Sequence, residues 1–132
     1  MRRFFPTMKW HNPMTPGSTY VEGPLTTNAG RSYQIRVYVP EQFPAICPSM
    51  IVSYPAPLRN RRGNVMTDAS ASMHTLGVRD GGTLICHYHP ARWVPENTLY
   101  KVLLKGRIWL EAYEGHLSTG NDIDFYLNHM PE

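Results

Sequence analysis

The spacing of apolar residues changes along the chain from a period of two to the longer period of a helix. Between Ser32 and Pro40, apolar and polar residues alternate, which is typical of a strand with one buried face. From Glu96 to Leu117, apolar residues recur at steps of three, four and seven, which predicts a long amphipathic helix. Any fold of this chain must therefore place strands first and a long helix after them.

Other segments of the first half are also predicted to be extended. Thr19 to Thr27 is expected to form a hairpin with the alternating strand across the turn residues Asn28-Ala29-Gly30. Ser49 to Tyr54, bounded by prolines, and Phe4 to Trp10 are further strand candidates. Ala56 to Asp80 has little periodicity and is expected to be an irregular crossing segment. The expected fold class is α+β, an antiparallel meander of three to four strands covered by a long C-terminal helix.

Single residues mark the ends of the helices. Pro95 and Glu96 suit the first turn of the long helix, and Gly120 is expected to stop it. Gly106 lies inside this helix and costs it about 1 kcal/mol in propensity relative to alanine, which indicates close packing against a neighbour. A short final helix is expected over Asp122 to His129.

The composition favours one globular domain over residues 1–132. Of the 132 residues, 42% are hydrophobic and 17% charged, which excludes a disordered polymer. The formal charge of +3 is too small to indicate a nucleic-acid partner. No apolar run approaches the roughly twenty residues of a membrane helix, and Met1 to Pro6 lacks the apolar stretch of a secretory signal. We therefore expect a cytoplasmic protein that does not bind a membrane.

The chain contains two cysteines, Cys47 and Cys86, too few for a disulfide framework. Cys47 follows Ile46 and is expected to pack in the core or in a turn. Cys86 lies between the turn residues Gly81-Gly82 and the segment Trp93-Val94-Pro95. A reactive thiol needs access and polar surroundings, and these neighbours make Cys86 the candidate nucleophile.

Two sets of residues resemble a known family. The first set comprises Phe43-Pro44, Pro48, Cys86, Trp93-Val94-Pro95, Leu99 and Val102-Leu103-Leu104. It resembles the core of ubiquitin-conjugating enzymes, in which the active cysteine precedes a Trp-Ser-Pro segment that opens a helix. The second set comprises His74, Asp80-Gly81, Ile85-Cys86-His87-Tyr88 and residues 108–114. It is similar to small bacterial members of that superfamily, several of which belong to antiphage operons.

This resemblance implies a ubiquitin-conjugating-enzyme-like fold and a thioester chemistry. Cys86 would accept the activated C-terminus of a carrier protein from an activating enzyme, and pass it to an amine or thiol of an acceptor protein. Backbone N–H groups near Gly81-Gly82 are candidate oxyanion donors. The possible supporting residues of the site are His74, Asp80, Gly81, Gly82, Trp93 and Pro95. No cofactor is expected.

Other interpretations of the same residues remain open. The chain lacks the His-Pro-Asn triplet of eukaryotic conjugating enzymes, so a catalytically silent protein-binding module is the alternative function. A cysteine hydrolase would need Cys86 with His74 or His89 and an orienting partner. A metal site at Cys86, His87 and His89 is not expected, because their spacing matches no recognised zinc pattern.

Overall fold

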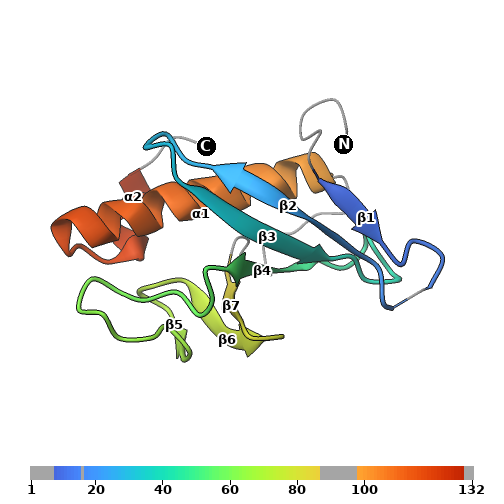
Figure 1. Cartoon of the computed structure of the whole chain (residues 1–132), viewed down its shortest axis with the longest axis horizontal. Helices are drawn as coiled ribbons and strands as arrows, with labels where there is room; N and C mark the ends of the chain where they lie inside the picture. Colours follow the sequence, from blue (N-terminus) through green and yellow to red (C-terminus); the bar gives the residue numbers. More distant parts are fainter. Residues whose placement is uncertain (1–7, 16, 87–97, 130–132) are drawn as a thin grey trace.

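A computed structural model describes residues 8–15, 17–86 and 98–129 of the chain (Figure 1). These residues form one seven-stranded sheet, in which all neighbouring strands are antiparallel, together with a long and a short helix. The strand order is β1-β2-β3-β4-β7-β6-β5. The strands are β1 (Lys9–His11), β2 (Tyr20–Thr26), β3 (Ser32–Tyr38), β4 (Ser49–Tyr54), β5 (Ala69–Ser70), β6 (Thr75–Arg79) and β7 (Gly82–Ile85).

The strands with a clear period of two are found where the sequence predicts them. In β3, Tyr33, Ile35 and Val37 are buried while the residues between them are not. β2 pairs with β3 from Tyr20↔Tyr38 to Thr26↔Ser32, which confirms the predicted hairpin. β4 has the predicted bounds, and β1 overlaps the end of the weaker N-terminal candidate.

Helix α1 (Leu99–Thr119) packs on one face of the sheet and crosses behind β2 and β3 in Figure 1. Thr98 caps its first turn by accepting a hydrogen bond from the Lys101 N–H, at 3.3 Å. Gly120 ends it in the left-handed conformation, with φ +86°. The buried face of α1 is formed by Val102, Leu103, Gly106, Trp109, Leu110, Ala112, Tyr113 and His116.

The close packing predicted at Gly106 is confirmed. A Cβ atom at this position would lie 2.5 Å from the sulfur of Met50, a β4 residue with no exposed surface. Helix α2 (Ile123–His129) follows α1 after a short connection and buries Ile123 in the same core. No helix of the described residues is long and apolar enough to cross a membrane.

The predicted fold class is wrong. A ubiquitin-conjugating fold has a four-stranded sheet with several helices, whereas this chain forms a seven-stranded sheet with one long and one short helix. The additional strands come from the segment expected to be irregular and from β7. β5 and β6 do not show the period-two pattern. β5 has only two residues. β6 exposes Leu76 and Val78 on either side of Gly77, next to a register shift in its pairing with β7.

Candidate functional site around Cys86

Cys86 follows the last residue of β7, where the chain leaves the sheet. Its side chain is half-buried and its thiol is not joined to Cys47 in a disulfide. The backbone N–H of Cys86 donates a hydrogen bond to the carbonyl oxygen of His74, at 2.8 Å. The backbone of Cys86 is therefore held by the residue that precedes β6.

The carbonyl oxygen of His74 also accepts a second hydrogen bond, from the indole Nε1–H of Trp109 at 3.0 Å. Trp109 belongs to α1 and is fully buried. One oxygen thus joins Cys86, at the end of a strand, to the helix that covers the sheet. His74 itself has a φ of +50°, which a non-glycine residue adopts at a cost of about 1 kcal/mol.

The imidazole of His74 points toward α2. Its Nε2 lies 2.6 Å from Oδ1 of Asp124, and both side chains are partly exposed. The backbone N–H of Asp124 in turn donates to the carbonyl oxygen of Ser72. The acidic partner holds the ring in one orientation, in the way that carboxylates orient histidines in catalytic and metal sites.

Burial raises the pKa of Cys86 above its ordinary value of 9.0. The thiol is therefore protonated at neutral pH. A cysteine in an ion pair with a histidine has a lowered pKa, because the imidazolium stabilises the thiolate. The shift at Cys86 is in the opposite direction.

Asp80 and Gly81 form the β6–β7 turn and Gly82 begins β7, at the opposite end of this strand from Cys86. Cys86 is four residue steps of extended chain from Gly82, a distance of about 13 Å. The structure therefore does not bring the predicted oxyanion donors to the thiol. Gly82 has a packing role instead, since a Cβ there would lie 2.7 Å from the carbonyl oxygen of Val52.

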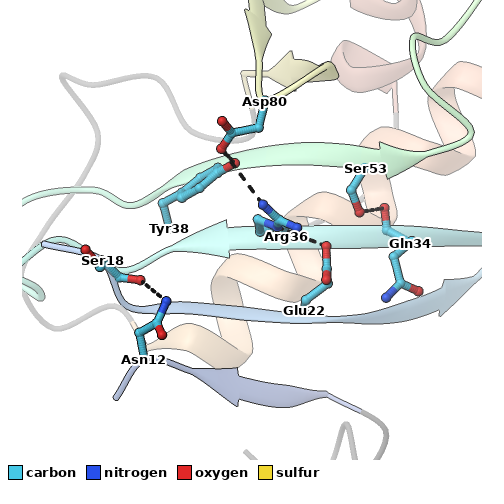
Figure 2. A network of polar contacts seen from close by, with 8 residues as sticks. All are labelled: Asn12, Ser18, Glu22, Gln34, Arg36, Tyr38, Ser53 and Asp80. Carbon is cyan, nitrogen blue, oxygen red and sulfur yellow. Dashed lines mark hydrogen bonds and ion pairs between the residues drawn. The ribbon is translucent and has the colours of Figure 1, made fainter. Parts of the chain in front are cut away.

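Asp80 belongs to a polar network on the face of the sheet, shown in Figure 2. Its carboxylate accepts a hydrogen bond from the Tyr38 hydroxyl and lies 3.9 Å from the guanidinium of Arg36. Arg36 donates to Glu22 at 2.9 Å. Burial, followed by the bond to Asp80, raises the pKa of Tyr38. This network anchors the β6–β7 turn on β3.

The remaining predicted site residues lie outside the described residues. They are Trp93 and Pro95, and the same is true of His87 and His89 from the alternative interpretations. Cys47 is described and lies just before β4, half-buried, where its thiol contacts the carbonyl oxygen of Pro48 at 3.5 Å. Within the described part of the chain, no group of three histidine, cysteine or acidic side chains could hold a metal ion.

A cavity of about 840 Å³ opens between the 60–75 segment and the junction of α1 with α2. His116 lines it, and both of its ring nitrogens have partners. Nε2 accepts a hydrogen bond from the Arg61 N–H at 3.1 Å, and Nδ1 lies 2.9 Å from the carbonyl oxygen of Asn121. His116 therefore connects the loop that contains Arg61 to the end of α1.

Comparison of the chain with family models, with curated proteins and with solved structures finds no match. The assignment of function consequently depends on the geometry around Cys86 and on the local sequence.

Two members of this site were not predicted. Asp124 follows His74 by 50 residues, and the hydrogen bond of the Trp109 indole to the His74 carbonyl oxygen had no signal in the sequence. The sequence signal for Asp124 was its place in the first turn of a predicted helix, where acidic residues are common for their effect on the helix dipole. Nothing in the spacing indicated that this turn faces His74.

Proposed function

We propose that Cys86 is an acyl-accepting thiol that takes the C-terminus of a carrier protein from an activated thioester and passes it to an amine or thiol. The observation that carries this proposal is the fixed position of Cys86. Its N–H is bonded to the His74 carbonyl oxygen at 2.8 Å, while the side chain stays half-buried at a strand end. An acyl carrier needs this combination of a positioned backbone and a reachable sulfur.

The chemistry is a thioester exchange. The Cys86 sulfur attacks the carbonyl carbon of the incoming thioester and loses its proton, and the donor thiol leaves with the electron pair of the broken C–S bond and takes up a proton. In the second step the amine or thiol of the acceptor attacks the new thioester and releases the Cys86 thiol. Cysteine suits both steps because sulfur is nucleophilic and also a competent leaving group.

The raised pKa of Cys86 favours storage of the acyl group. A thiol of higher pKa is a poorer leaving group, so its thioester is lost more slowly to weak nucleophiles such as water. The same shift slows the first attack at neutral pH, since less thiolate is present. Acceptance of the acyl group should therefore accelerate as the pH rises towards the pKa of the thiol.

The local frame of Cys86, and not the fold, supports this function. The sequence around Cys86 resembles that of ubiquitin-conjugating enzymes, whereas the seven-stranded sheet differs from their four-stranded one. The proposal therefore covers only the thioester chemistry. It does not extend to the partner-binding surfaces of ubiquitin-conjugating enzymes.

A cysteine hydrolase is a second candidate, because His74 has an orienting acidic partner in Asp124. A hydrolase would use His74 to deprotonate Cys86 and to activate water. The direction of the Cys86 pKa shift favours acyl storage over this reaction. The two candidates differ in the fate of the acyl group, which is held in one case and released to water in the other.

The test uses ubiquitin-like carriers whose C-terminus is a thioester of 2-mercaptoethanesulfonate. The reduced protein is incubated with each carrier, and the mass of the intact protein is measured with and without dithiothreitol. We expect a dithiothreitol-sensitive adduct on the wild type and on Cys47→Ala, and none on Cys86→Ala.

Three results would contradict the proposal. An adduct that persists in Cys86→Ala would place the acyl group elsewhere. Rapid release of carrier acid without a lasting adduct would favour the hydrolase. Binding of the carriers without any adduct, while iodoacetamide still alkylates Cys86, would favour the silent binding module.

A further inference from the structure

The two cysteines lie at the same end of two neighbouring strands. β4 begins at Ser49 and β7 ends at Ile85, and these strands pair with Met50 opposite Ile85. Continuing this antiparallel register by one residue places Cys86 opposite Ser49. Cys47 comes two residues before Ser49, so the same register continued beyond the end of β4 would make it the diagonal neighbour of Cys86, on the same face.

The distance between such neighbours is close to what a disulfide needs. Diagonal neighbours have Cα atoms about 7–8 Å apart with Cβ atoms somewhat closer, and a disulfide joins Cα atoms up to about 6.8 Å apart. The remaining movement of about 1 Å falls on the segment before β4, which belongs to no strand. Both thiols are also only partly buried, so a small reagent can reach them.

We propose that Cys47 and Cys86 form a reversible disulfide that closes the thiol site under oxidising conditions. The pairing depends on strand order and was not visible in the sequence, where Cys47 had a packing role only. It goes beyond the proposed acyl transfer, because the bond can form whether or not Cys86 ever carries an acyl group. If Cys86 does carry one, the disulfide makes transfer dependent on the redox state of the surroundings.

An electrostatic effect between the two thiols supports this pairing. The pKa of Cys47 is raised to about 11, first by burial and then by the charge of Cys86. Burial also raises the pKa of Cys86. The first thiolate to form is therefore expected at Cys86, with Cys47 as the resolving thiol.

The reaction balances with oxidised glutathione as the oxidant. The Cys86 thiolate attacks one sulfur of glutathione disulfide, which gives a mixed disulfide and one glutathione thiolate. The Cys47 sulfur, on losing its proton, attacks the mixed disulfide at Cys86 and releases the second glutathione. The protein loses two hydrogen atoms, and one glutathione disulfide becomes two molecules of reduced glutathione.

The experiment equilibrates the reduced full chain in buffers of reduced and oxidised glutathione, blocks remaining thiols with N-ethylmaleimide and measures the intact mass. In the wild type we expect both thiols to disappear together without a lasting glutathione adduct. Peptide mapping should find the segments of Cys47 and Cys86 linked. The effective concentration of the two thiols for one another should be at least about tenfold higher in the folded protein than in the guanidinium-denatured chain.

Matched variants separate an internal bond from independent oxidation. Cys47→Ser and Cys86→Ser should each retain a stable mixed disulfide with glutathione, because no second thiol resolves it. Independent glutathione adducts on both cysteines of the wild type would overturn the proposal, as would a disulfide between two chains or an effective concentration equal to that of the denatured chain. None of these readouts uses a carrier protein, so failure here and failure of thioester formation are distinguishable.

Discussion

Alkaline pH should weaken the folded state through the thiol of Cys47. Burial and the charge of Cys86 raise the pKa of Cys47 from 9.0 to about 11. The folded protein therefore holds this proton more tightly than the unfolded chain does. The resulting stabilisation is fully present below pH 9 and is lost as the pH rises through 11.

The size of this effect follows from the shift. A difference of about two pKa units corresponds to about 2.7 kcal/mol when the thiol is fully titrated, and about half of it is lost at pH 10. Because the thiol is only half-buried, solvent screening lowers the expected loss at pH 10 to about 0.5–1 kcal/mol.

Urea unfolding followed by circular dichroism, in the presence of a reductant, measures this loss at pH 7.5 and pH 10. The free energy of unfolding should fall by about 0.5–1 kcal/mol more in the wild type than in Cys47→Ala. Tyr33 and Tyr113, whose pKa values are also raised, first by burial, titrate in both proteins and cancel in the difference. Equal losses in the two proteins would refute the reasoning.

Urea unfolding also tests three glycines. Gly82→Ala should cost about 2 kcal/mol or more, because its Cβ would lie 2.7 Å from the backbone oxygen of Val52, which cannot turn aside; a loss below about 0.5 kcal/mol would contradict this packing. Gly106→Ala should cost about 1–2 kcal/mol. The cost is limited because the clash is with the movable sulfur of Met50 and because alanine improves helix propensity. The double variant Gly106→Ala with Met50→Val should recover part of the loss. Gly120→Ala should cost about 1 kcal/mol because φ is +86°, and a neutral effect would argue against the left-handed cap.

The parts of the fold that the sequence predicts are those with strong local periodicity. β3 alternates buried and partly exposed residues over its whole length, and α1 repeats its apolar face for five turns. Gly106 was predicted to pack closely because a glycine inside such a helix is costly unless a neighbour fills the space. In each case one segment contained the whole signal.

The parts that could not be predicted depend on contacts between distant segments. β7 lies between β4 and β6, and no local pattern specifies that order. The proximity of Cys47 to Cys86 follows from the pairing of β4 with β7. The pairing of His74 with Asp124 likewise depends on how α2 folds back after α1. The fold prediction was wrong for the same reason, since it assigned the four-stranded sheet of ubiquitin-conjugating enzymes to segments whose own pairing was undetermined.

His74 links Cys86, at the end of a strand, to both helices. Its carbonyl oxygen accepts hydrogen bonds from the Cys86 N–H, just after β7, and from the Trp109 indole of α1. Its ring is hydrogen-bonded to Asp124 of α2. The backbone of Cys86 is thus tied to the packing of two helices against a strand end. A change that displaces α1 or α2 from the sheet should therefore move Cys86 as well, although neither helix contains the reacting atom.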